Sequence, residues 1–132
     1  MAVIDFRLRP PLKGFLDMIM YAGAERRDRL TRQHGMEPAP SAQAQSMPLL
    51  LAEMDAAGVT LGVIMGRCSG VYGAVTNQDV ADIVRAYPGR FIGIGSIDPG
   101  SRKAAMQQIE EAMALGLKGI NIEPGAYAEP ML

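Results

Sequence analysis

The 132-residue chain predicts an α/β fold, in which parallel strands alternate with helices. Four apolar stretches have the length and composition of strands. Segments whose apolar residues recur at helical spacing lie between the later strands, and glycine or proline turns bound most of these elements. Strands joined by helices of ten or more residues imply crossover connections and a parallel sheet.

The first strand is predicted at residues 2–9, where apolar and polar side chains alternate until Pro10 and Pro11 end the pattern. Residues 12–45 form a long connection, for which we expect a loop or lid, because connections of this length are usually functional or disordered. Within it, residues 17–33 have helical composition and carry a strongly charged run.

The next helix is predicted at residues 46–57, with Pro48 in its first turn and Gly58 at its end. Residues 59–65 predict the second strand. This stretch is almost entirely apolar, as expected of a strand that is covered on both faces.

The remaining elements follow the same order. A glycine-rich loop at 66–75 precedes a helix at 77–86, and residues 91–97 predict the third strand. Ser101 is suited to cap a helix that ends before Gly116. Residues 117–122 predict the fourth strand.

Composition indicates a globular protein of one domain, with 48% hydrophobic and 20% charged residues. A net charge of −1 favours neither nucleic acid nor an anionic membrane surface as a partner. No signal peptide pattern or membrane-spanning run is present, and the single Cys68 fits a reducing compartment. We therefore expect a soluble cytoplasmic protein. The glycine patterns of dinucleotide and nucleoside triphosphate sites are missing from the sequence.

Three segments, residues 52–64, 90–100 and 114–125, resemble strands 2, 3 and 4 of the amidohydrolase-2 family and the residues around them. Members of that family are eight-stranded TIM barrels that hydrolyse or decarboxylate small organic acids and lactones, generally with a bound divalent metal. The resemblance implies that residues 1–132 form the N-terminal half of such a barrel, with strands 1 to 4.

The chain departs from the family pattern at the end of the first strand. Family members usually have Asp-x-His-x-His there, with both histidines as metal ligands, whereas this chain has Asp5-Phe-Arg7-Leu-Arg9. Arginine offers no lone pair and cannot replace a histidine ligand. The other family ligands lie on later strands. We expect no metal or cofactor within this chain, although zinc or manganese is possible in a longer protein.

The polar residues of the first strand alternate with Ile4, Phe6 and Leu8, which we expect to pack against the helices. Asp5, Arg7 and Arg9 would then face the barrel interior. Asn121 and Glu123 occupy similar positions at the end of the fourth strand. These side chains should meet at the barrel mouth, where barrel enzymes have their active sites.

Two convergent arginines are suited to bind a carboxylate or phosphate. Arg7, Arg9 and Asn121 are therefore candidate substrate-binding residues, and Glu123 and Asp5 are candidate catalytic residues. The alternative is structural, with Asp5 paired to Arg7 and Glu123 paired to Arg9.

Several other residues have both a functional and a structural interpretation. Arg67, after the second strand, either joins the anion site or is a solvated loop residue. Cys68 is expected to be a small packed residue rather than a nucleophile, and His34 to lie in the long connection. We expect Met54, Met106 and Met113 to fill the core, and Met18 and Met20 are candidates for lining a pocket.

The function expected from these residues is that of an amidohydrolase-like hydrolase, or its N-terminal portion, acting on a small carboxylate-bearing compound. A non-catalytic or metal-free binding protein and a decarboxylase of the same family are the alternatives. Because four parallel strands leave two open edges, we expect a homo-oligomer or a missing C-terminal half-barrel as partner.

Overall fold

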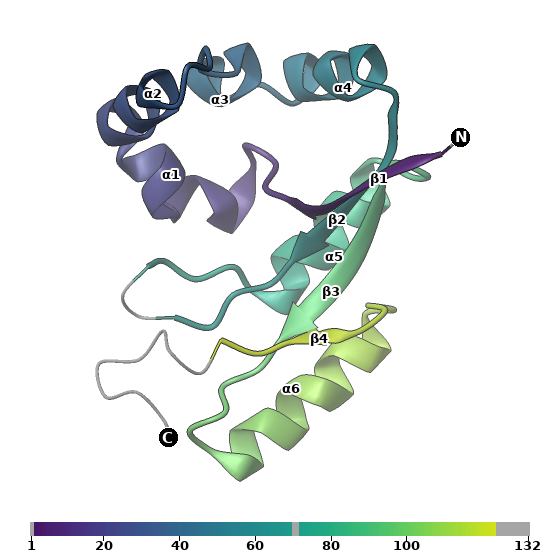
Figure 1. Ribbon diagram of the computed structural model, residues 1–132. Coiled ribbons are helices and arrows are strands. Elements are labelled where there is room, and N and C mark those ends of the chain that lie inside the picture. Colours follow the sequence, from purple (N-terminus) through teal and green to yellow (C-terminus); the bar gives the residue numbers. More distant parts are fainter. Residues whose placement is uncertain (1, 70–71, 124–132) are drawn as a thin grey trace.

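A computed structural model describes residues 2–69 and 72–123 of the chain. It contains one parallel sheet in the order β1-β2-β3-β4 (Figure 1). The strands are β1 (Val3–Leu8), β2 (Val59–Met65), β3 (Phe91–Ser96) and β4 (Ile120–Asn121). The predicted α/β fold with parallel strands is confirmed, although β4 is shorter than the six residues expected.

Three helices connect successive strands and pack against the sheet: α4 (Met47–Ala56), α5 (Asn77–Ala86) and α6 (Arg102–Ala114). Each begins after a hydroxyl residue whose side chain accepts a hydrogen bond from a backbone N–H of the first turn. These residues are Ser46, Thr76 and Ser101. The caps explain why the helix boundaries were predictable within one or two residues.

The hydrophobic core lies between the outer face of the sheet and the helices. Ile64 of β2 and Phe91 of β3 are buried against Val80 and Ile83 of α5. Met54 of α4 belongs to the same core, as the sequence predicts. Within the described residues, no helix has the length and apolarity needed to cross a membrane.

Where we expected a loop or lid at residues 12–45, the structure has four short helices. They are η1 (Lys13–Asp17), α1 (Ile19–Ala22), α2 (Ala24–Gln33) and α3 (Pro40–Ala44), so the helical composition of residues 17–33 is confirmed. Phe15, Met18 and Tyr21 anchor the segment in the core. At its other end, the backbone N–H and side-chain hydroxyl of Ser41 donate to the carboxylate of Glu53 in α4.

The alternation predicted for β1 is interrupted. Asp5 pairs with Gly62 and Leu8 with Ile64, so β1 advances three residues while β2 advances two. Leu8 packs against the core as expected. Phe6 is 69% exposed and Ile4 is also exposed, so the expectation that they pack under the helices is wrong.

The prediction that two methionines of α6 fill the core is also wrong. Met106 and Met113 are exposed, whereas Ala112 of the same helix is buried. Only part of the predicted apolar face of α6 therefore contacts the sheet.

Candidate functional site

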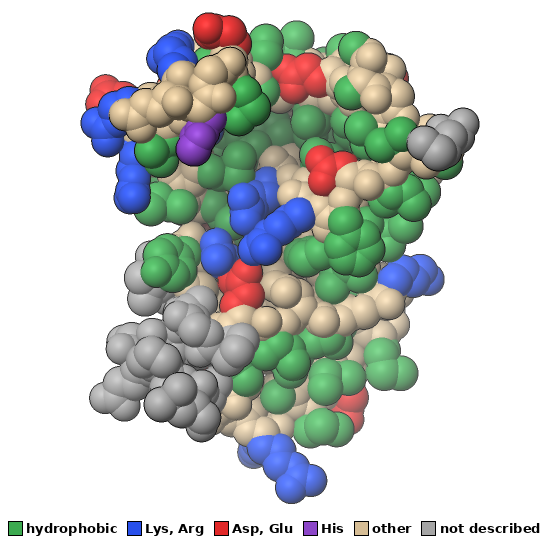
Figure 2. Space-filling model, in the orientation of Figure 1, with side chains coloured by type: hydrophobic (Ala, Val, Ile, Leu, Met, Phe, Trp, Pro, Cys, Tyr) green, Lys and Arg blue, Asp and Glu red, His purple; other side chains and the backbone are tan. Residues whose placement is uncertain are grey.

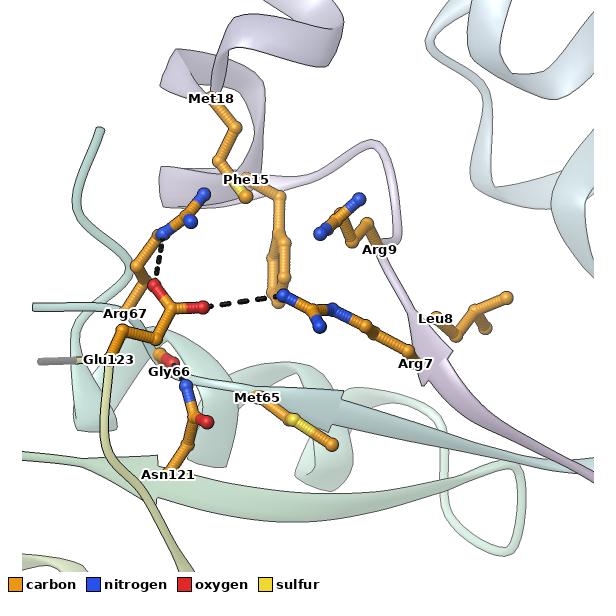
Figure 3. Close-up of a pocket in the computed structure, with 10 residues that line it drawn as sticks. All are labelled: Arg7, Leu8, Arg9, Phe15, Met18, Met65, Gly66, Arg67, Asn121 and Glu123. Atoms are coloured by element: carbon orange, nitrogen blue, oxygen red, sulfur yellow. Dashed lines mark hydrogen bonds and ion pairs between the residues drawn. The ribbon is translucent and has the colours of Figure 1, made fainter. Parts of the chain in front are cut away.

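Most of the polar side chains expected at the barrel mouth, but not Asp5, line one small pocket at the carboxyl ends of the strands (Figure 3). Its volume is about 20 Å³, which is room for one group of the size of a water molecule. Apolar residues form part of its wall: Leu8, Phe15, Met18 and Met65. Its polar lining residues are Arg7, Arg9, Arg67, Asn121 and Glu123.

Glu123 binds two arginines from different strands. Its Oε2 accepts a hydrogen bond from Nε of Arg67 at 2.5 Å, and its Oε1 accepts one from Nη2 of Arg7 at 3.3 Å. Both partners of the Arg67 pair are largely buried, whereas the Arg7 side chain is 64% exposed. The Arg67 pair is therefore the stronger of the two, because exposed ion pairs contribute little.

Arg9 differs from its two neighbours. Among residues 2–69 and 72–123, its guanidinium has neither a hydrogen-bond partner nor an ion-pair partner, and Figure 3 shows it on the same side of the pocket as Arg7. Burial lowers the pKa of Arg9, and the positive charges of Arg7 and Arg67 lower it further, against the opposing effects of Glu123 and Tyr21. The guanidinium is still protonated at neutral pH, so this pocket holds an uncompensated cation.

The formal charges of the described pocket therefore do not cancel. Three guanidinium groups face one carboxylate, which leaves two positive charges. Figure 2 shows Lys and Arg side chains gathered in a hollow near the centre of this face of the molecule. Such a cluster, partly shielded from water, favours an anion.

The structural alternative that we considered from the sequence is wrong in its pairings. Glu123 binds Arg7 and Arg67 rather than Arg9. Asp5 accepts a hydrogen bond from the backbone N–H of Arg7 at 2.9 Å and does not line the pocket. Asp5 is thus separated from the residues with which we grouped it, because the register shift breaks their shared row.

Asn121 and Arg67 are tied to the loop that follows β2. Nδ2 of Asn121 donates to the carbonyl oxygen of Gly66 at 3.3 Å. The backbone of Arg67 exchanges two hydrogen bonds with Val75, which closes the loop at its base. Arg67 is therefore a fixed pocket residue, and the alternative of a solvated loop arginine is wrong.

Tyr21 of α1 contacts the backbone of the pocket residue Arg9, and its sequence position did not single it out. Its hydroxyl donates a hydrogen bond to the carbonyl oxygen of Arg9 at 2.6 Å. Burial raises the pKa of Tyr21 to about 12. Phe15 lines the pocket and was also missed, because the long connection gives no periodicity that orients its side chains.

Cys68 and His34 lie outside the arginine pocket. Cys68 is partly buried. His34 lines a neighbouring groove together with Met20, whereas Met18 lines the arginine pocket. Both methionines left open by the sequence therefore line concave surfaces.

The donor groups of the described pocket do not suit a divalent metal. Its arginines have no lone pair to donate, and both oxygens of Glu123 already accept hydrogen bonds. No group of three His, Cys, Asp or Glu side chains with metal-binding geometry occurs within the described part of the chain. We assign no metal to these residues.

Comparison with solved structures supports the barrel fold. The chain superimposes on the crystal structure of an uncharacterized TIM-barrel protein from Bordetella bronchiseptica with a TM-score of 0.93 and 50% sequence identity. The match covers 99% of this chain and 47% of that protein, so the chain spans about half of its length. No family model and no curated protein matches the chain. The chain therefore has the fold of about half of a TIM barrel.

Proposed function

We propose that the arginine pocket binds the carboxylate of a small organic acid, and that the barrel is an amidohydrolase-like hydrolase acting on that acid. The observation that carries the proposal is Arg9, a half-buried cation without a counter-ion in the described pocket. Partial burial removes some of the water around this charge, and a bound anion would offset that loss. The position at the carboxyl ends of the strands is where barrel enzymes bind substrates.

Arg7 and Arg67 complete this proposed anion site. Each uses one side of its guanidinium to bind Glu123, which leaves other N–H groups available for a ligand. Glu123 then acts mainly as a positioning residue, because it holds two arginines from β1 and the loop after β2. The hydrolytic step is proposed from the resemblance of the later strands to amidohydrolases, with Glu123 and Asn121 near the reacting centre.

A second candidate function is a binding protein without catalysis. It is favoured by the same engagement of Glu123, whose oxygens are both occupied and therefore poorly placed to accept a proton from water. Turnover distinguishes the candidates. Hydrolysis of an ester or lactone of a bound acid supports the enzyme, and tight binding without turnover supports the binding protein.

The anion site is tested by titrating the chain with acetate and following the NMR shifts of pocket residues. Arg9→Ala should weaken acetate binding by at least about tenfold, which corresponds to about 1.4 kcal/mol. Arg85→Ala is the matched control, since Arg85 is an exposed arginine of α5 that pairs only with Asp82 among the described residues. Equal affinities for wild type and Arg9→Ala would refute the assignment. If inorganic phosphate binds more tightly than any carboxylate, the proposed ligand is a phosphate and not a carboxylate.

A further inference from the structure

An apolar groove lies beside the arginine pocket, between α1, α2 and the loop after β2. Its volume is about 460 Å³, far larger than the pocket. Ile19, Leu30, Met36 and Tyr72 line it and are all substantially exposed. Exposed apolar side chains that gather in one concavity indicate a binding surface.

Two observations place the groove next to the pocket. The guanidinium of Arg67, which lines the pocket, lies 5.4 Å from the ring centroid of Tyr72, which lines the groove. Met18 and Met20, two residues apart, line the pocket and the groove respectively. In Figure 2, hydrophobic side chains border the hollow that holds the arginines.

Two arginines, Arg26 and Arg27, line the groove, and the less exposed of them, Arg27, is already neutralised. Arg27 binds the carboxylate of Asp28 at 2.7 Å and the carbonyl oxygens of Met20 and Ala42. Arg26 is exposed to water, where a charge binds an anion only weakly, so the groove offers mainly apolar surface rather than a second strong anion site.

We infer that the ligand of this chain is an amphipathic organic acid whose carboxylate enters the arginine pocket and whose apolar chain or ring lies in the groove. The inference rests on the proposed anion site and names its substrate class. The pocket has room for a group of about the size of a water molecule, so only the carboxylate oxygens of an acid can reach into it and the rest of the acid must extend elsewhere. The neighbouring groove offers the volume and the apolar lining that such a group requires.

The experiment compares acetate with hexanoate, and hexanoate with hexanol, by titration of the chain. Each methylene that is buried strengthens binding by up to about fourfold. Hexanoate should therefore bind at least about tenfold more tightly than acetate, and hexanol more weakly than hexanoate. The neutral variant Leu30→Asn should reduce hexanoate affinity towards that of acetate and leave acetate affinity unchanged.

The matched control is Leu49→Asn on α4, because Leu49 is 40% exposed, Leu30 is 42% exposed, and Leu49 lies outside the groove. Loss of the chain-length effect in Leu30→Asn but not in Leu49→Asn supports the inference. Acetate binding with no gain for hexanoate, equal binding of hexanol, or equal effects of the two variants would each overturn the inference and leave the anion site standing. Failure of every carboxylate to bind would overturn both.

Discussion

Arg67 and Glu123, 56 residues apart in sequence, are joined by a hydrogen bond of 2.5 Å between Nε and Oε2. The pair connects the loop after β2 to the segment after β4 across the mouth of the half-barrel. With Arg7 on the other carboxylate oxygen, it fixes residues from three parts of the chain around one pocket.

Replacement of Glu123 tests whether its carboxylate mainly neutralises the arginines or is needed to hold them in place. Glu123→Gln keeps an acceptor and removes one negative charge, so the positive charge of the pocket rises. We expect acetate to bind about threefold more tightly at low ionic strength, and the gain to shrink when salt is added. Titration at two salt concentrations measures this. A loss of binding would instead show that the charge of Glu123 is needed to hold the arginines.

A buried asparagine links three elements behind the site. Oδ1 of Asn77 accepts a hydrogen bond from the backbone N–H of Ser96, and its Nδ2 donates to the carbonyl oxygen of Gln108 and to Glu111. Asn77→Ala should lower the free energy of unfolding by about 1–3 kcal/mol, because a buried N–H loses its acceptor. Urea unfolding measures the change. The neighbouring exposed residue serves as control, since Gln78→Ala should change stability by less than about 0.5 kcal/mol.

Two methionines that the sequence assigns to the core differ in their exposure to solvent. Met54 is 3% exposed and Met106 is 51% exposed. Met54→Ala should destabilise the chain by about 2–5 kcal/mol and Met106→Ala by less than about 0.5 kcal/mol. Thermal and urea unfolding of the two variants provide the comparison. Equal losses would mean that the outer face of α6 is covered in solution.

Stability should fall at high pH because of Tyr21. The pKa of its hydroxyl is raised from 10 to about 12, so the folded state keeps a proton that the unfolded state has lost. The contribution is complete below pH 10 and is lost as the pH rises to about 12. The difference in unfolding free energy between wild type and Tyr21→Phe should therefore be smaller at pH 11 than at pH 9. A difference that does not change with pH would contradict the assignment, as would a phenolate titration without a component near pH 12.

Much of the fold follows from local signals in the sequence. Hydroxyl caps at Ser46, Thr76 and Ser101 and glycine stops define the helices, and apolar runs define β2 and β3. The exposed positions of Met106 and Met113 do not follow, because the helical pattern cannot show how wide a face the sheet covers.

The site residues at the ends of the strands were predictable from the sequence. Those in the segment 12–45 and Tyr72 in the loop after β2 were not. Arg7, Arg9, Arg67, Asn121 and Glu123 meet because parallel strands end at one edge of the sheet. Phe15, Tyr21 and Tyr72 come from short helices and a loop, whose side-chain directions depend on tertiary packing. Asp5 was grouped with the arginines because an unbroken two-residue period was assumed.

The register shift in β1 also affects how related barrels are aligned. Phe6 and Arg7 together stand opposite the single residue Val63, so β1 carries one residue more than β2 between Asp5 and Leu8, whereas the shift between Val3 and Ile4 runs the other way. A homologue without this extra residue would match the chain only as two blocks, one ending at Asp5 and one starting at Leu8. An alignment of the two sequences without a gap would shift one block by one residue. A charged residue of the barrel mouth would then be aligned with a residue that faces the opposite side of the sheet.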